Sequence, residues 1–400
     1  MPFSRQDESS RRSLKTANRI NHKIQRKVMK ILVCVSEYFP EGSGIAIVAH
    51  NLVQELKSMH GDYTICTPNG PDIQLGNSQL IKKTGIVGLL YYWLCVSIYI
   101  RKKNIEYDVI WLHNPLFLLN VPHHHKYLIT IHSTYYRKLL DGVYPLCYYR
   151  IASWIEKYSI NKISRQKPLF LGVSTTVIDS LKKIGVPANS LYRISNGVKT
   201  DLFKPVDNKK RIRAKFGIPE DNVVLLSLGR LSESKQPLKL IEVFEILQSK
   251  CKRFSLVVAG TGELMQKTKD LVQEKKIENV IFLGHINHEL DAPDLYAASD
   301  YFIMTSKSEG NPLTLIEAIS SGLPCIVSNI PPLSIVEELN CGIVVDFSDT
   351  QVAAQKILEY LKKPDRNHSC NGRTYILENL SWSKIGKQYQ NLFENLLRCD

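Results

Sequence analysis

Residues Tyr301–Ala318 read YFIMTSKSEGNPLTLIEA, and this stretch shows the pattern on which the prediction of the fold class rests. It opens with four apolar or aromatic residues, passes through a polar loop around Gly310 and Pro312, and ends with the apolar spacing of a helix. A strand that is apolar at every position is buried on both faces, as in a parallel sheet covered by helices. The stretch therefore predicts one strand–loop–helix unit of a doubly wound α/β fold.

The same unit recurs along most of the chain. Strands are predicted in the first half at Lys30–Val35, Tyr63–Thr67, Asp108–Leu112, Tyr127–Ile131 and Leu169–Val173, and in the second half at Val223–Leu228, Ser255–Ala259, Val280–Leu283, Tyr301–Met304, Pro324–Ser328 and Ile343–Val345. The pattern breaks near Asn196–Asp207, and 400 residues is too long for one ordinary core. We expect two facing Rossmann-like domains, 29–195 and 196–381, with ligands at the carboxyl ends of their strands.

The net charge of +14 lies entirely in the first half of the chain. Residues 1–195 hold 26 Lys and Arg against 12 Asp and Glu, whereas residues 196–400 hold 26 of each kind. A one-sided basic surface suits an anionic partner, such as nucleic acid, anionic lipid headgroups or a phosphorylated substrate, and a solvated face without a partner fits equally well. Residues 1–28 are polar and lack an apolar core, so we expect a disordered basic tail, with Met29 as a candidate start of the natural chain.

The nine cysteines are scattered and form no C-x-x-C pair, which fits neither a disulfide framework nor a zinc site. A cytoplasmic location follows as the expectation. Thr84–Ile100 is a charge-free run of 17 residues between Lys82-Lys83 and Arg101-Lys102-Lys103, and a membrane span needs about 20. Its aromatic residues and basic flanks instead predict a buried helix or one docked peripherally on an anionic membrane surface.

The strongest chemical signal is the pair Glu309 and Glu317, one in a loop after a strand and the other about two helical turns along. A helix start beside the loop offers free N–H groups to a phosphate, and the carboxylates can accept hydrogen bonds from sugar or ribose hydroxyls. Read conservatively, Glu309 lies near a helix start and Glu317 is a solvated helix residue.

A second signal, Gly229-Arg230-Leu231 with Lys235, ends another predicted strand. It brings two cations to a place where a departing diphosphate would need them. The chain has no D-x-D sequence, so we expect no metal and no cofactor. The two cations would then neutralise the diphosphate in place of a metal ion.

Three further loops follow strands. Gly260-Thr261-Gly262 is compatible with nucleotide binding or with a simple tight turn. Gly42 and Gly44 lie at a strand-to-helix turn and allow a diphosphate or an acceptor to approach the backbone. His113 and His132 end two strands of the first domain, and two histidines at one sheet edge suggest the cleft.

Taken together, these residues resemble the retaining glycosyltransferases of family 4, the glycosyl transferases group 1, which adopt the GT-B fold. Ser308–Ala318 followed by Gly322-Leu323-Pro324 looks like the family's E-x7-E motif and the strand after it. Ser195–Pro205 is similar to the family's interdomain linker, with Lys199 in place of the usual Asp, and Thr130-Ile131-His132 resembles the segment of its active-site histidine, with Ser133 where Gly is usual. Ser381-Trp382 and the final helix, 382–400, resemble the segment that crosses back onto the first domain.

The resemblance implies a role for each matching residue. Arg230 and Lys235 would neutralise the diphosphate of a UDP- or GDP-sugar, and Glu317 would hold the ribose. Glu309 and the backbone of Gly310 and Asn311 would orient the sugar, and His132 would line the acceptor side. Gly44 would lie under the diphosphate from the opposite domain. The donor-site residues are then Gly44, Gly229, Arg230, Lys235, Gly262, Glu309, Gly310, Asn311, Leu313 and Glu317.

The resemblance also implies retention of anomeric configuration by front-face attack, in which the leaving phosphate takes the acceptor proton, so that no protein base is required. The acceptor is then a glycan or a lipid-linked sugar in cell-surface polysaccharide or glycolipid synthesis.

Other functions stay open on the sequence alone. A nucleotide-sugar epimerase shares the architecture but needs carboxylates in both domains. A glycosidase would need its carboxyls about 5–10 Å apart, whereas Glu309 and Glu317 lie roughly 12 Å apart along a helix. A nucleic-acid-binding protein would suit the charge, but the chain shows no aromatic–basic interleaving and no recognition helix, so we expect no nucleic-acid partner.

Overall fold

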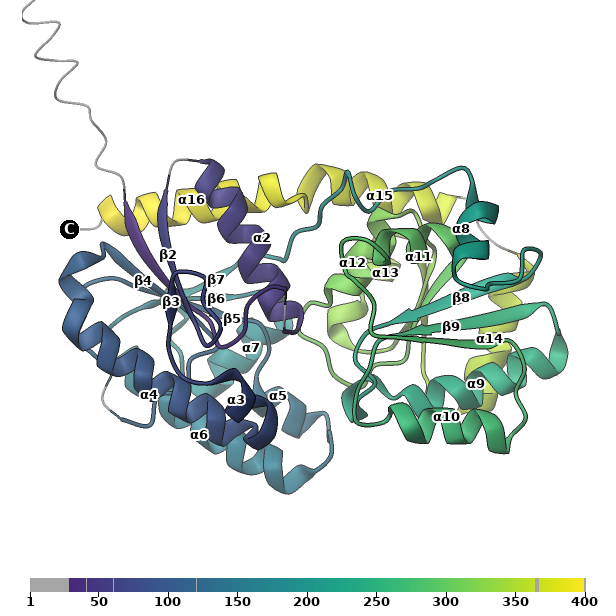
Figure 1. The fold of residues 1–400 in the computed structure, drawn as a ribbon, viewed down its shortest axis with the longest axis horizontal. Coiled ribbons are helices and arrows are strands. Elements are labelled where there is room, and N and C mark those ends of the chain that lie inside the picture. The colour runs from purple at the N-terminus through teal and green to yellow at the C-terminus, as the bar shows by residue number, and fades with distance from the viewer. Residues whose placement is uncertain (1–28, 41, 60, 120, 364–366, 399–400) are drawn as a thin grey trace, which may run out of the picture.

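The computed structural model describes residues 29–398 apart from 41, 60, 120 and 364–366, so the predicted tail 1–28 lies outside the described residues. Two parallel sheets lie side by side, each enclosed by helices (Figure 1). The first sheet has the strand order β3-β2-β1-β4-β5-β6-β7 and the second the order β10-β9-β8-β11-β12-β13. The prediction of two doubly wound parallel-sheet domains is confirmed.

The strands of the first sheet are β1 Lys30–Cys34, β2 Asp62–Thr67, β3 Ile73–Gln74, β4 Val109–His113, β5 Tyr127–Ile131, β6 Leu169–Gly172 and β7 Leu191–Arg193. Those of the second are β8 Val223–Leu228, β9 Phe254–Ala259, β10 Val280–Gly284, β11 Tyr301–Met304, β12 Cys325–Ser328 and β13 Gly342–Val345. Each predicted strand is present within a residue or two of its predicted ends. The sequence analysis missed β3 and β7, because both are short edge strands with partly polar side chains and lack a continuous apolar run.

The helices of the first half are α2 Gly44–Ser58, α3 Ser78–Thr84, α4 Ile86–Lys103, α5 Tyr135–Leu140, α6 Leu146–Ser164 and α7 Thr175–Ile184. Those of the second half are α8 Lys209–Lys215, α9 Pro237–Lys250, α10 Met265–Glu274, α11 Ala292–Ala298, α12 Leu313–Ser320, α13 Ile335–Glu338, α14 Thr350–Lys362, α15 Asn367–Asn379 and α16 Trp382–Arg398. Several begin at a hydroxyl or carboxylate N-cap, as Ser43, Thr134 and Asp349 do, which satisfies N–H groups that the helix itself leaves unpaired.

Different helices cover the two faces of the first sheet. Side chains of α4, α6 and α7 pack against one face. The other face is covered by α2 and α16, where the Trp111 ring of β4 lies 5.2 Å from Tyr389 and 5.4 Å from Phe393 of α16, centroid to centroid. Helix α16 therefore returns to the first sheet after the second has been completed, as the long yellow helix in Figure 1 shows.

The charge-free run Thr84–Ile100 corresponds to the end of α3 and most of α4. Helix α4 packs on the first sheet through Tyr92, Trp93 and Val96, which are fully buried. In the described part of the chain, no helix has the length and apolar character that crossing a membrane requires.

Candidate functional site

The carboxyl ends of β8 and β9 hold a tight pair of glycine loops. A Cβ on Gly260 would lie 1.9 Å from the Gly229 carbonyl oxygen, and one on Gly262 would lie 2.2 Å from that of Leu231. The backbones touch, and Leu231 donates its N–H to the Thr261 carbonyl at 2.9 Å. The loop Gly260–Gly262 therefore supports the loop that carries Arg230, and this structural role does not depend on contact with a ligand. Gly229 itself has φ of +152°, a conformation that favours glycine.

The two strongest sequence signals meet at this edge of the second sheet. The ammonium of Lys235, on a single helical turn after β8, lies 2.5 Å from the Glu309 carboxylate, which is only 8% exposed. Thr305 fixes this arrangement by donating its hydroxyl to the Lys235 carbonyl at 3.0 Å. A small cavity beside the pair is lined by Gly229, Arg230, Lys235, Thr305 and other residues. The structure thus brings predicted diphosphate and sugar residues together.

Glu317 lies apart from this pair, on α12, and its carboxylate is 3% exposed. One oxygen lies 2.7 Å from His288 Nε2, and the other accepts the Tyr296 hydroxyl at 3.0 Å. Burial lowers the pKa of His288, but the charge and hydrogen bond of Glu317 outweigh it, so the pKa is raised overall. The Phe203 ring packs against both partners, with centroids 5.5 Å from His288 and 5.7 Å from Tyr296. The ribose role of Glu317 stays a prediction, and a ligand there would meet a carboxylate that already has two partners.

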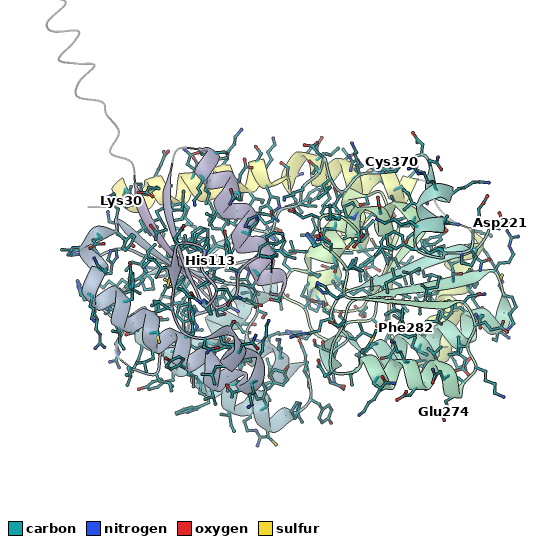
Figure 2. The ribbon with its side chains drawn as sticks, viewed as in Figure 1. Lys30, His113, Asp221, Glu274, Phe282 and Cys370 are labelled. Atoms are coloured by element: carbon teal, nitrogen blue, oxygen red, sulfur yellow. The ribbon has the colours of Figure 1, made fainter. Side chains whose placement is uncertain are left out.

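The two predicted histidines of the first domain form a buried pair. His113 Nδ1 lies 2.9 Å from His132 Nε2, and the rings stack with centroids 5.2 Å apart. Burial lowers the pKa of His132 to about 3 and holds that of His113 well below its usual range, with His132 adding to the effect. Figure 2 places His113 inside the first domain, whereas Glu274 lies at the outer edge of the second. Both imidazoles are therefore neutral near pH 7, in keeping with a positioning role for His132.

The E-x7-E loop touches the first domain directly. A Cβ on Gly310 would lie 2.0 Å from the His132 carbonyl oxygen, so only glycine fits. The Asn311 amide donates to the Val173 carbonyl at 2.9 Å and to the Ser195 hydroxyl at 2.8 Å. The side chain of Asn311 therefore joins the two domains, while a sugar contact through its backbone stays a prediction.

Two predicted donor-site residues face each other across the domains at helix starts. Helix α2 begins at Gly44 and α12 at Leu313, and a Cβ on Gly44 would lie 3.9 Å from Leu313 Cδ1. Glu37 secures the turn before α2 by accepting the Ser43 N–H and hydroxyl, both at 2.7 Å. Glu41 of the same loop lies outside the described residues. Gly44 is thus close enough to the second domain to share a ligand with it.

Lys138 joins this charged cluster from the first domain and was missed by the sequence analysis. Its helix, α5, is held against the second domain near both ends: His132 touches Gly310, and Lys307 donates to the Gly142 carbonyl at 2.8 Å. Burial lowers the pKa of Lys138, while nearby carboxylates raise it and the cations Lys235 and Arg230 lower it further. Cations from both domains therefore repel one another, and an anionic ligand bound between them would relieve this repulsion.

Glu156 of α6 holds the start of α5 in place. Its carboxylate accepts the N–H groups of Tyr135 and Tyr136 at 3.0 and 2.9 Å, and Thr134 accepts that of Arg137 at 3.0 Å. Burial raises the pKa of Glu156 to about 7 despite these bonds and despite Lys138.

Across the described residues, His, Cys, Asp and Glu side chains form no group of three or more that could hold a metal ion. The expectation of chemistry without a metal or cofactor stays a prediction.

The two parallel-sheet domains have the GT-B fold, which is also that of a solved glycosyltransferase of lipopolysaccharide biosynthesis, WaaG, with a TM-score of 0.74 at 20% identity over 90% of this chain and 98% of that chain. Sucrose-phosphate synthase from Thermosynechococcus elongatus has the same fold, with a TM-score of 0.76, over 93% of this chain and 100% of that chain at 20% identity. Residues 42–202 match the family model described as Glycosyltransferase Family 4, and residues 208–375 match the one described as Glycosyl transferases group 1. The two matches together cover about four fifths of the chain, which belongs to this glycosyltransferase family.

Two curated relatives illustrate the range of the family. The chain is 32% identical over 209 residues to the Escherichia coli UDP-Gal:alpha-D-GlcNAc-diphosphoundecaprenol alpha-1,3-galactosyltransferase, a match that covers 48% of this chain and about half (52%) of that relative. It is 25% identical over 383 residues to the alpha-monoglucosyldiacylglycerol synthase of Streptococcus pneumoniae, covering 91% of this chain and 85% of that relative. Each of these names describes the relative, and both concern glycolipid or polysaccharide synthesis.

Proposed function

We propose that this protein is a retaining glycosyltransferase that moves a hexose from a UDP- or GDP-sugar to a glycan or lipid-linked acceptor, in cell-surface polysaccharide or glycolipid synthesis. The observation that carries the proposal is the Lys235–Glu309 pair, 2.5 Å apart beside Arg230 and opposite the loop of His132. The E. coli relative is named for a UDP-sugar donor and a diphospholipid-linked acceptor, which supports this substrate class. We place the reaction in the cytoplasm, on the inner face of a membrane.

The cations stabilise the departing diphosphate. Negative charge develops on the leaving group as the glycosidic bond breaks, and fixed cations in a partly dry site stabilise that charge without reorganising. The glycine loops support the loop of Arg230, and Thr305 bonds to the backbone of Lys235, which supports this role. With the diphosphate bound, Lys235 exchanges part of its contact with Glu309 for the phosphate, which frees the carboxylate to accept a sugar hydroxyl.

The acceptor side needs no titrating base. Since burial keeps the pKa of His132 near 3, the neutral imidazole orients the acceptor and the sugar but does not store a proton at pH 7. The acceptor hydroxyl forms its bond to the anomeric carbon on the face that the diphosphate leaves, and its proton goes to the departing phosphate oxygen. Configuration is then retained.

The proposal is tested by measuring donor binding and transfer in the same preparation. A panel of UDP- and GDP-sugars is screened for thermal stabilisation, because a ligand that binds only the folded state raises the melting temperature. Transfer is then followed with the radiolabelled sugar that stabilises most. We expect Lys235→Ala and Glu309→Ala each to cut transfer by at least ~100-fold, as removal of transition-state electrostatics does.

Lys267→Ala, at an exposed position on α10, is the matched control and should keep full activity. Near-normal turnover in either site variant would contradict the proposal. A product analysis that found only an isomerised donor, with no sugar on any acceptor, would indicate an epimerase instead.

A further inference from the structure

Helix α4 is apolar on two opposite faces. Tyr92, Trp93, Val96 and Ile100 point inward and are fully buried against the first sheet. The outward face carries four exposed apolar residues at helical spacing: Val87, Tyr91, Leu94 and Ile98. The outer face of a surface helix in a soluble protein is normally polar. The outer stripe of α4 therefore has the composition of a contact surface that is not covered within this chain.

Helix α6 has a matching stripe. Ile151, Trp154 and Tyr158, spaced by three and four residues, are exposed, with Trp154 at 66%. The rings of Trp154 and Tyr158 stack on each other with centroids 5.9 Å apart, so the two aromatics form one flat apolar face. Ile155 and Ser159, which directly follow these two aromatics in the sequence, are buried. Exposed indole and phenol rings side by side are costly in water unless something covers them.

The two stripes form a single surface. Both helices cover the same face of the first sheet, and their starts lie close together, since a Cβ on Gly85 would lie 3.7 Å from the Tyr148 hydroxyl. The segment 114–119 links them, since Phe117 packs on Trp93 of α4 with centroids 5.4 Å apart and donates its N–H to the Ser159 hydroxyl of α6 at 2.7 Å. This segment adds exposed Leu118 and Leu119. We name the outward residues of α4, α6 and 114–119 the α4–α6 surface.

Cations surround the α4–α6 surface. Exposed basic residues lie before α4, at its end and on α6: Lys82, Lys83, Arg101, Lys102, Lys103, Arg150 and Lys157. Lys162 lies over the Tyr158 ring, 4.7 Å from its centroid. Within α4, α6 and 114–119 the single acidic residue is Glu156, which is buried and bonded to α5, and just beyond them Glu106 pairs with Lys103. An apolar, aromatic centre with a basic rim is complementary to acyl chains beneath anionic headgroups.

We propose that the α4–α6 surface docks this protein on an anionic lipid bilayer. Trp154, Tyr158 and Tyr91 lie at the level of the headgroups, and the basic rim meets the lipid charges. Helix α6 also reaches toward the catalytic cleft, because Tyr149 near its start lies 5.8 Å from the ammonium of Lys138, measured to the ring centroid. Docking would therefore hold the acceptor side of the cleft close to the membrane. The inference gives a docking surface to the membrane location in the proposed function, on which it rests, and flotation tests it separately from sugar transfer.

Vesicle flotation of the full chain tests the proposal. We expect the protein to float with phosphatidylcholine vesicles that contain phosphatidylglycerol, to stay behind with phosphatidylcholine alone, and to be released as salt rises. The double substitution Ile98→Ser with Trp154→Ser should lower vesicle affinity by about tenfold or more, because two apolar groups no longer enter the bilayer. Arg150→Gln and Lys157→Gln should each lower it by about fivefold.

Val352→Ser, at a position 63% exposed on α14 of the other domain, is the control and should bind vesicles normally. All of these side chains lie outside the catalytic cleft, so thermal stabilisation by the nucleotide sugar should be unchanged in every variant. Unaltered flotation of the double variant would overturn the proposal. So would a dimer, seen in sedimentation of the parent protein and lost in the double variant, because the surface would then face a second copy of the chain.

Discussion

Both carboxylate oxygens of Glu317 already have partners in the absence of a ligand. Of these partners, His288 is the one that can gain or lose a proton near neutral pH. The pKa of His288 is raised overall by Glu317. A raised histidine pKa contributes stability that is complete below the unfolded value of about 6.5 and is lost as pH rises through the higher folded value. The pair therefore stabilises the second domain most on the acid side of neutrality.

We predict that His288→Gln reduces the free energy of unfolding most at and below about pH 6.5 and least well above it. Glutamine keeps a donor for Glu317 but cannot carry the charge. Urea unfolding across this pH range measures the effect, with the exposed His285→Gln as control. A loss of stability that does not vary with pH would mean that the pair is never charged.

Lys138 leads to a second prediction about a single residue. Removal of one cation from a partly screened cluster should weaken binding of a diphosphate by about tenfold, so Lys138→Ala should lower affinity for the nucleotide sugar by that factor. Lys138→Arg should restore most of it, and Lys183→Ala, an exposed lysine on α7, should have no effect. Titration calorimetry with UDP or GDP checks this. Equal affinity of the alanine variant and the parent would remove Lys138 from the donor site.

The sequence predicted the residues whose neighbours are local and missed those whose neighbours are distant. Glu309 and Lys235 come directly after strands of one parallel sheet, so their meeting follows from topology. His288, Tyr296 and Lys138 are placed by the packing of α11, of α5 and of the loop after β10, and no motif marks them. Their roles depend on contacts across 21 to 29 residues or between domains, such as Tyr296 with Glu317 and His288 with Glu317.

At the scale of elements, the glycine loops after β8 and β9 suggest a direct test. Gly260 has φ of +126° and no room for a side chain, since a Cβ would lie 1.9 Å from a backbone oxygen. Gly260→Ala should therefore destabilise the protein by about 1–3 kcal/mol and displace the loop of Arg230, with a loss of UDP or GDP affinity. Urea unfolding and calorimetry measure the two effects.

Gly217→Ala is the matched control for the loops. Gly217 also has a positive φ, +65°, but a Cβ there would meet nothing within 4 Å. The control should therefore show only a backbone penalty of about 1–2 kcal/mol and normal nucleotide affinity. If both variants bound nucleotide normally, the contact between the loops would have no part in the donor site.

The strands that could be predicted are those with mainly apolar sequences. The strands β4, β5 and β9 have no exposed residue and appear in the sequence as mainly apolar runs. Helix α4 was found as a charge-free run, but its two opposed apolar faces were not, because that division depends on which side meets the sheet. Edge strands β3 and β7 carry no such run.

At the scale of the whole molecule, α16 joins the two halves. Phe393 is completely buried between Trp111, Tyr63 and Tyr389, all within aromatic contact distance. Phe393→Ala should cost about 3–5 kcal/mol of unfolding free energy, as truncation of a buried aromatic does. Because the cavity would open against the first sheet, hydrogen exchange should accelerate in β4 more than in β11.

The control for α16 is Leu377→Ala, at a partly exposed position on α15, which should change stability by less than about 0.5 kcal/mol. Unchanged exchange in β4 of the Phe393 variant would show that α16 adds little to the first sheet.

The sequence indicated two domains, and the resemblance to the family implied a returning helix. The aromatic contacts that fix it pair Trp111 with Tyr389 and Phe393, about 280 positions later, which no local pattern encodes.

The return of α16 also sets an order of events at the ribosome. The strands β8–β13 are all translated before Trp382, so the second sheet can close while the chain is still growing. The first sheet, although made earlier, keeps the part of its surface around Trp111 uncovered by α16 until that helix emerges. A nascent chain in that state exposes aromatic side chains to which chaperones and other copies of the chain can bind. The domain that is synthesised first is therefore the last to be completed.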